Sequence, residues 1–193
     1  MKFLALGDSY TIGESVAEDQ RWPIQLVKQL KARGKNFDAP QIIATTGWRT
    51  DDLKEAIIAA NPPKDFDMVS LLIGVNNQYQ GKSVESYAPE FEELLKMAIA
   101  FAGGDKERVF VVSIPDYGYT PFGKEKQESI TKALNDYNRV NKEITMKYGV
   151  KYFNITDISR KSFEDPGLVA NDGLHPSGKM YKQWVEVIIE GLE

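Results

Sequence analysis

The chain has 193 residues, of which 42% are apolar and 27% are charged, as in an ordinary globular protein long enough to bury a full core. Its net charge of −4 argues against nucleic acid and anionic membrane surfaces as partners. It has no cysteine and one histidine, which excludes disulfides, thiolate metal sites and zinc sites built from nitrogen and sulfur ligands.

Short apolar runs alternate along the whole chain with longer amphipathic segments. The runs are apolar throughout rather than at every second residue, which is typical of strands covered on both faces. In chain order the pattern predicts strand Lys2–Leu6, helix Trp22–Arg33, strand Gln41–Ala44, helix Asp51–Ala60, strand Met68–Ile73, helix Val84–Ala102, strand Val109–Ile114, helix Lys124–Tyr148, strand Tyr152–Ile155 and helix Ser177–Leu192.

This alternation predicts the fold class. We expect an α/β protein with a three-layer, flavodoxin-like sandwich, in which a central parallel sheet of about five strands is flanked by helices. The sequence shows no internal repeat and no linker, so a single domain over residues 1–193 is expected. In such sheets ligands bind beyond the carboxyl ends of the strands, near the switch in strand order.

Candidate catalytic residues follow four of the predicted strands. Ser9 follows the first strand, Gly47 the second and Asn76 the third, while Asp172 and His175 lie after the fifth. Because these strands are parallel, we expect all five residues at one rim of the sheet.

His175 is the only side chain whose ordinary pKa suits general acid–base chemistry near neutral pH. A serine nucleophile needs such a base, and the base needs a carboxylate to fix its tautomer. A glycine such as Gly47 lets the backbone approach a reacting oxygen, and the amide of Asn76 donates hydrogen bonds without adding a net charge.

Four blocks of sequence together resemble a known family. They are Gly7-Asp8-Ser9, Gly47, Gly74-Val75-Asn76 and Asp172-Gly173-Leu174-His175, and they occur in this order. On these blocks the chain resembles the SGNH hydrolases, the superfamily of GDSL-type esterases and lipases, over nearly its whole length. It departs from the namesake motif at Tyr10, where that motif has leucine.

The resemblance implies a serine hydrolase that cleaves carboxylic esters through an acyl-enzyme. It implies Ser9 as the nucleophile, His175 as the base and Asp172 as the group that orients the imidazole. The implied oxyanion hole consists of the backbone N–H groups of Ser9 and Gly47 and the side-chain amide of Asn76. The expected partner is a small-molecule ester, and no metal or organic cofactor is implied.

The substrate is less defined, because the family spans lipid esters, thioesters, arylesters and acetylated sugars. A lysophospholipase, a thioesterase and a carbohydrate acetylesterase therefore all remain open. No large insertion follows any predicted strand, so we expect an open, shallow site for short-chain acyl or acetyl esters. Aromatic and basic residues near the strand ends are candidates for substrate contact. For Tyr117, Tyr119 and Phe122 the alternative is that their loop packs on itself and seals the end of the sheet. These candidates are Tyr10, Trp48, Arg49, Tyr117, Tyr119 and Phe122.

Other interpretations of the sequence exist beside the esterase. Asp8 is interpreted as a turn cap without a chemical role, and the stretches 82–96 and 124–132 as solvated helix faces. Gly81-Lys82-Ser83 lacks the preceding glycine of a P-loop, and no Gly-x-Ser-x-Gly elbow occurs. The alternative of a different class is a non-catalytic module that binds small molecules on a flavodoxin-like fold.

No stretch approaches the ~20 apolar residues of a membrane span. The apolar start of the chain is interrupted at Gly7-Asp8-Ser9, before the apolar region of a signal peptide is complete. A native Met1 predicts a cytoplasmic protein, and a removed leader predicts a secreted or periplasmic one. The sequence carries no signal for the oligomeric state.

Overall fold

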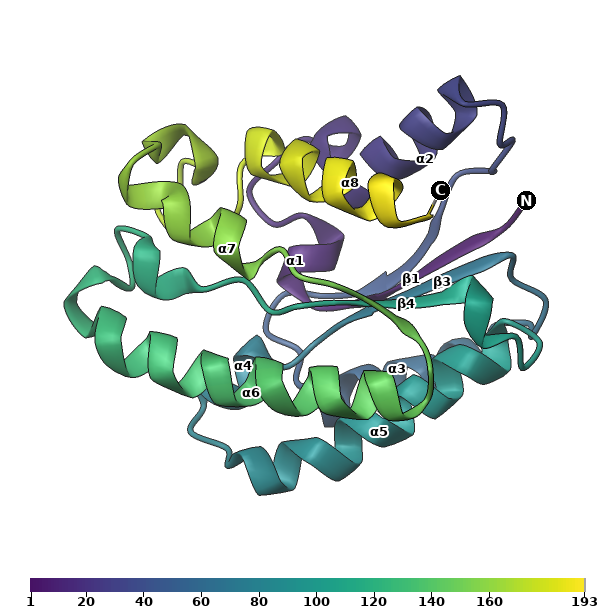
Figure 1. Cartoon of the computed structure of the whole chain (residues 1–193), viewed down its shortest axis with the longest axis horizontal. Coiled ribbons are helices and arrows are strands. Elements are labelled where there is room, and N and C mark those ends of the chain that lie inside the picture. Colours follow the sequence, from purple (N-terminus) through teal and green to yellow (C-terminus); the bar gives the residue numbers. More distant parts are fainter. Residues whose placement is uncertain (193) are drawn as a thin grey trace.

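A computed structural model of the chain describes residues 1–192 and has a five-stranded parallel sheet at its centre. The strand order is β2-β1-β3-β4-β5, and helices cover both faces of the sheet (Figure 1). The predicted three-layer α/β fold is therefore confirmed. The strands are β1 (Phe3–Gly7), β2 (Gln41–Ala44), β3 (Met68–Leu72), β4 (Val109–Val112) and β5 (Lys151–Phe153).

The helices form two layers. One face of the sheet is covered by α1, α2, α7 and α8, and the other by α3, α4, α5 and α6 (Figure 1). Within these layers α2 packs against α8, and α5 packs against α6. The helices are α1 (Ser9–Ile12), α2 (Trp22–Ala32), α3 (Thr50–Ala60), α4 (Val75–Tyr79), α5 (Val84–Phe101), α6 (Gln127–Lys147), α7 (Thr156–Ser159) and α8 (Gly178–Leu192).

Local sequence signals set the bounds of the longer helices. Pro23 lies in the first turn of α2, where its missing N–H has no intrahelical partner to lose. The Ser83 hydroxyl caps α5 by accepting a hydrogen bond from the backbone N–H of Ser86 at 3.2 Å. Asn61 ends α3 in a left-handed conformation with φ of +41°.

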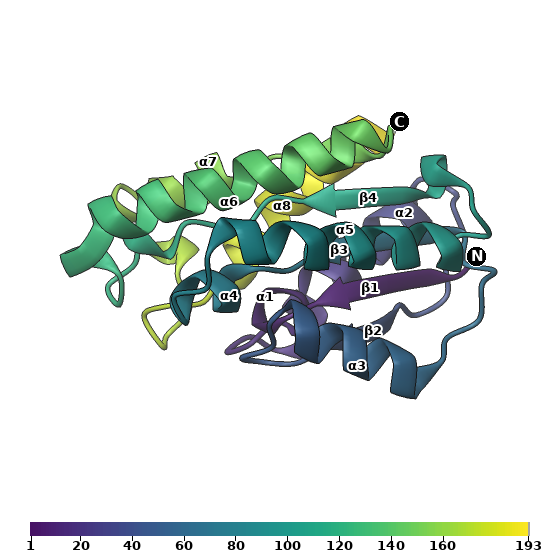
Figure 2. The same ribbon diagram turned by 90° about the horizontal axis from the view of Figure 1, so that it is seen from below.

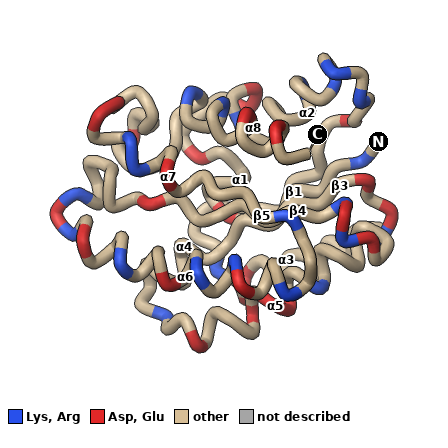
Figure 3. Tube along the Cα trace, in the orientation of Figure 1, with Lys and Arg blue, Asp and Glu red and all other residues tan. Residues whose placement is uncertain are grey.

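The core lies on both faces of the sheet, because every residue of β1, β3 and β4 is buried. These three strands contain no charged residue, and the charges of both signs lie on the surrounding helices and loops (Figure 3). On one face the fully buried indole of Trp22 contacts the ring of Phe3, with centroids 6.2 Å apart. On the other face the rings of Tyr87 and Tyr137 lie 4.5 Å apart. Apolar burial on both faces accounts for the unbroken apolar runs in the sequence.

The strand order creates a switch point between β1 and β3. From β1 the chain passes to β2 on one side and then returns to β3 on the other side, with both strands parallel to β1. The segments that leave β1 and β3 therefore diverge, which opens a crevice beyond the strand ends. Figure 2 shows that α1 and α4 both lie at this end of the sheet.

The predicted strands and long helices are present with ends that shift by up to three residues. The short helices α1, α4 and α7 were not predicted from the sequence. The helix predicted from Lys124 begins later, because residues Lys124–Lys126 form a 3-10 turn and α6 begins at Gln127. Within residues 1–192, no helix has both the length and the apolar character needed to cross a membrane.

Candidate active site

Ser9 lies at the point where β1 turns into α1. Asp8 caps this helix, and its Oδ1 accepts a hydrogen bond from the backbone N–H of Tyr10 at 3.0 Å. The turn depends on Gly7, because a Cβ there would lie 2.2 Å from the Thr11 hydroxyl and 2.6 Å from the carbonyl oxygen of Leu72. The first N–H groups of a helix lack intrahelical partners, so the Ser9 N–H belongs to this set.

A cavity of about 310 Å³ lies beyond the strand ends and contains Ser9. Its wall joins segments from both ends of the chain, so the predicted meeting of Ser9 with His175 at one rim is observed. The lining residues are Ser9, Tyr10, Thr46, Gly47, Val75, Asn76, Tyr79, Tyr117, Phe122, Leu174 and His175.

Asp172 holds the imidazole of His175. The Asp172 Oδ2 lies 2.6 Å from the His175 Nδ1, and its Oδ1 accepts the backbone N–H groups of Leu174 and His175, each at 2.9 Å. The loop is closed behind the ring, because the Ala170 N–H donates to the carbonyl oxygen of His175 at 2.7 Å. With Nδ1 engaged by the carboxylate, Nε2 is the ring nitrogen left for chemistry in the cavity.

The carboxylate of Asp172 is stabilised in its ionised form. Partial burial opposes ionisation, but hydrogen bonds from the Ser15 hydroxyl, His175 and two backbone N–H groups outweigh it. Together they hold the pKa of Asp172 well below its ordinary value. A carboxylate that stays ionised keeps the proton of the imidazole on Nδ1.

Gly47 and Asn76 line the same cavity. Gly47 has φ of +87°, with open space around its Cβ position. The left-handed backbone is therefore one reason for glycine here, and the close approach of this backbone to a reacting oxygen stays a prediction. Asn76 donates one N–H of its amide to the carbonyl oxygen of Trp48 at 2.9 Å, which fixes the amide and leaves its second N–H.

Asn77 has a different role from its neighbour. Its side chain is buried, with Oδ1 accepting the backbone N–H of Thr50 at 3.1 Å and Nδ2 donating to the Thr50 hydroxyl at 2.7 Å. It therefore ties α4 to the start of α3. Gly74 makes the turn before Asn76 possible, with φ of +132° and a Cβ position 2.7 Å from the ring of Tyr87.

Asp8 is fully buried and directly precedes Ser9. Its Oδ2 makes no hydrogen bond among the residues that the structure describes. Burial raises the pKa of Asp8 from 3.8 to about 7, against the opposing effect of the backbone hydrogen bond from Tyr10. The sequence predicts Asp8 as a turn cap, and in the structure Asp8 caps the short helix α1.

Aromatic rings form one end of the cavity. Tyr79 and Phe122 are 59% and 54% exposed, and each lies within 6.4 Å of the ring of Tyr117. Tyr10 is almost fully buried and presents its ring to the imidazole of His175, with centroids 6.0 Å apart. Tyr10, Tyr117 and Phe122 thus lie where the sequence analysis expected them.

Three of the predicted contact residues do not line the cavity. Arg49 bonds the carboxylate of Asp51 at 2.6 Å and starts α3, so its charge is used within the fold. Trp48 packs partly against the core, and Tyr119 lies against the ring of Phe163 at 5.2 Å. Trp48, Arg49 and Tyr119 thus lie outside the cavity lining, in contrast to Tyr10, Tyr117 and Phe122.

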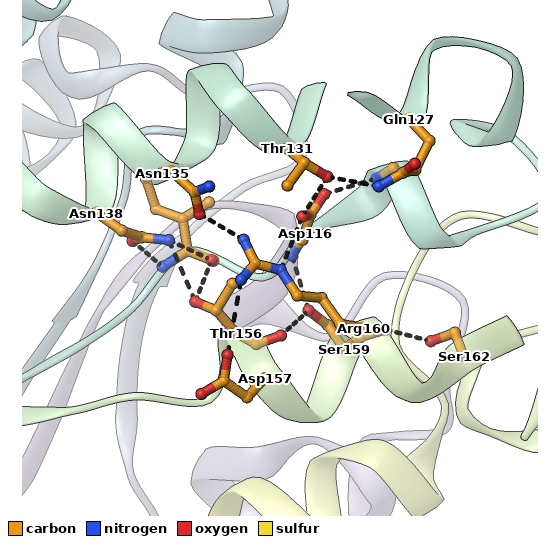
Figure 4. A network of polar contacts seen from close by, with 12 residues as sticks. Asp116, Gln127, Thr131, Asn135, Asn138, Thr156, Asp157, Ser159, Arg160 and Ser162 are labelled. Carbon is orange, nitrogen blue, oxygen red and sulfur yellow. Dashed lines mark hydrogen bonds and ion pairs between the residues drawn. The ribbon is translucent and has the colours of Figure 1, made fainter. Parts of the chain in front are cut away.

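A buried polar network fixes the loop that carries Tyr117 and Phe122 (Figure 4). At its centre Asp116 is fully buried and accepts the Nε–H of Arg160 at 3.0 Å and the Thr131 hydroxyl at 2.7 Å. The loop is thereby anchored to α6 and to the segment after α7, which holds the aromatic end of the cavity in place.

Several residues of the site were not predicted from the sequence. Tyr79 follows Asn76 by three positions, so a short helix at that point would have predicted both on one face. Thr46, Val75 and Leu174 adjoin recognised positions, whereas nothing in the sequence relates Ser15 to Asp172. Within residues 1–192, no group of three or more His, Asp or Glu side chains is arranged to hold a metal ion.

The sequence profile of the GDSL-like lipase/acylhydrolase family matches residues 5–183. The chain belongs to this family. A comparison with curated protein sequences finds no match. Family membership makes the chain a hydrolase, with the cleavage of carboxylic esters as its general activity and a small molecule as its substrate.

Solved structures share the fold at low sequence identity. TesA superposes with a TM-score of 0.78 at 16% identity, covering 100% of this chain and 98% of that one. A variant of Axe2, an acetyl-xylooligosaccharide esterase from Geobacillus, gives 0.74 at 19% identity, covering 99% and 93%. The acetyl xylan esterase AlAXEase gives 0.75 at 14% identity and covers 100% of both chains. These likenesses show that the chain shares its three-layer fold with these solved structures.

Proposed function

We propose that the chain cleaves short-chain carboxylic esters, above all acetyl esters, through an acyl-enzyme on Ser9. The observation that carries the proposal is the cavity in which Ser9 meets His175, whose Nδ1 is held by Asp172 at 2.6 Å. A hydroxyl and an imidazole that line one cavity, with a carboxylate bonded to the imidazole, are the groups that nucleophilic acyl transfer requires.

Acylation begins when Nε2 of His175 takes the proton of the Ser9 hydroxyl. The serine oxygen bonds to the acyl carbon, and the carbonyl electron pair moves onto its oxygen. The N–H groups of Ser9, Gly47 and Asn76 stabilise this developing charge, because they are fixed before the reaction starts. Asp172 stabilises the imidazolium that forms at the same time.

Collapse of the intermediate breaks the bond to the alcohol oxygen, and His175 returns its proton to the departing alcohol. Water then enters, gives a proton to His175 and attacks the acyl carbon by the same route. The acid departs, and Ser9 regains its hydroxyl proton from the imidazole. His175 therefore acts as base and then as acid in each half of the cycle.

The size and the walls of the cavity favour a short acyl group. Its volume of about 310 Å³ lies at the low end of the range for small-molecule sites. The exposed rings of Tyr79 and Phe122 give its outer end an apolar surface on which the alcohol part of a substrate can pack. Two structural neighbours, Axe2 and AlAXEase, are described as acetyl-sugar esterases, which supports acetylated saccharides as one substrate class.

The test is hydrolysis of p-nitrophenyl esters from acetate to laurate, together with acetylated xylose. We expect the highest kcat/KM for acetate or butyrate and no acyl transfer by Ser9→Ala. Ser86→Ala, which alters an exposed serine of α5, serves as the matched control and should equal the wild type. Equal rates in the wild type and Ser9→Ala would refute the esterase and favour the alternative of a non-catalytic binding module. A rate that rises steadily to laurate would instead favour a lipid esterase or thioesterase.

A further inference from the structure

Ser15 occupies an unusual position in the turn that follows α1. Its φ is +66°, and among the non-glycine residues of 1–192 only Asn61 shares a positive φ. Gly13, two positions earlier, is also left-handed at +75°, so the chain reverses sharply here. Glycine would adopt this conformation without strain, and serine does not. A serine at this position therefore suggests that its hydroxyl makes a contact that offsets the backbone strain.

That contact is the acid–base pair at the other end of the chain. The Ser15 hydroxyl donates to Oδ2 of Asp172 at 2.6 Å, and the same oxygen accepts Nδ1 of His175 at 2.6 Å. The other oxygen, Oδ1, accepts two backbone N–H groups of its own loop. Each carboxylate oxygen therefore has two donors, and rotation of the carboxylate would break several hydrogen bonds together.

The turn itself is held from a second side. Next to Ser15, the Glu14 carboxylate accepts a hydrogen bond from the Thr46 hydroxyl, in the loop that carries Gly47. One short turn after the nucleophile thus bonds to the loop with the oxyanion glycine and to the loop with the base. These two hydrogen bonds restrain the turn, and they fix the position from which the Ser15 hydroxyl donates to Asp172.

We propose that Ser15 is a positioning residue, whose hydroxyl holds Oδ2 of Asp172 where it accepts the Nδ1 proton of His175. The proposal rests on the proposed function, because it concerns the base of that reaction. The side chain of Asp172 is 30% exposed, so water replaces any donor that is removed and the carboxylate gains freedom. The hydrogen bond from Ser15 also leads the contacts that lower the pKa of Asp172.

Ser15→Gly separates positioning from folding. Glycine suits the left-handed backbone, so the variant should be at least as stable as the wild type while lacking the hydroxyl. Asn61→Gly is the matched control, because it makes the same backbone change at the end of α3, away from the cavity. Ser15→Ala removes the hydroxyl but keeps a side chain, and it provides a second comparison.

The readouts are steady-state kinetics on p-nitrophenyl acetate and NMR of protein with ¹⁵N-labelled histidine. The chain has one histidine, so the spectrum contains a single imidazole and needs no assignment. For both Ser15 variants we expect kcat to fall about tenfold with KM unchanged, and the imidazole to lose part of its Nδ1–H tautomer. Asn61→Gly should match the wild type in both measurements.

Wild-type kcat in the Ser15 variants overturns the proposal, and so does a lower kcat with an unchanged imidazole spectrum. The spectrum does not depend on turnover, so the two hypotheses fail separately. Hydrolysis that survives in Ser9→Ala would refute the proposed function, while the imidazole spectra would still decide whether Ser15 orients the Asp172–His175 pair.

Discussion

The buried carboxyl of Asp8 predicts a pH-dependent stability that a single substitution removes. Raising the pKa of Asp8 from 3.8 to about 7 means that the folded chain keeps this proton over a range in which the unfolded chain has lost it. The contribution of Asp8 to the unfolding free energy therefore falls as pH rises from about 4 to about 7 and is flat above that range. The shift corresponds to a loss of about 4 kcal/mol.

Asp8→Asn keeps the helix cap, because its amide oxygen can still accept the Tyr10 N–H. The amide nitrogen that replaces Oδ2 changes stability by an amount that does not depend on pH. All other titrating groups are shared with the wild type, so the difference between the two proteins isolates Asp8.

The assay is urea unfolding of both proteins from about pH 4 to about pH 9. The stability of Asp8→Asn relative to the wild type should rise by about 4 kcal/mol up to neutral pH and then level off. A difference that stays constant over the whole range would refute the assignment of a raised pKa to Asp8.

The remaining predictions concern neighbouring pairs of residues. Asn76→Ala should lower kcat by about 10²–10³ with little change in stability, whereas Asn77→Ala should unfold more easily, as kinetics and urea titration of both variants will show. Gly47→Ala should lose about 1–2 kcal/mol of stability and most of its activity, because alanine is strained at φ of +87°; unchanged kinetics would contradict this. Arg160→Met should lose about 2–4 kcal/mol and raise KM, because Asp116 stays buried without its cation. Arg139→Met, which breaks an exposed pair, is its control and should change little.

The fold was predictable because the strands are buried on both faces. The runs in β1 and β3 are apolar at every position except Ser70 and the terminal Gly7, and such runs fix strand positions to within a residue or two. The short helices α1 and α4 were not predictable, because helices of four and five residues depend on tertiary contacts rather than on their own propensity.

The candidate site was predictable where its residues follow strands. Ser9, Gly47, Asn76 and His175 share one cavity because parallel strands end at one rim. The contact between Ser15 and Asp172 joins positions 157 residues apart, and no local pattern encodes it. The ion pair of Arg49 with Asp51 at the start of α3 was equally unpredictable, because sequence position alone does not show where a side chain points.

The central claim is that Ser9 is the nucleophile of an acyl transfer, and covalent trapping tests it most directly. A phosphonate ester with a good leaving group forms a stable bond to a reactive serine, and digestion with trypsin releases residues 3–21, which contain both Ser9 and Ser15. Fragmentation in the mass spectrometer should place one phosphonyl group on Ser9 in the wild type, and Ser9→Ala should remain unlabelled. Labelling of another residue, or equal labelling of Ser9→Ala, would contradict the account.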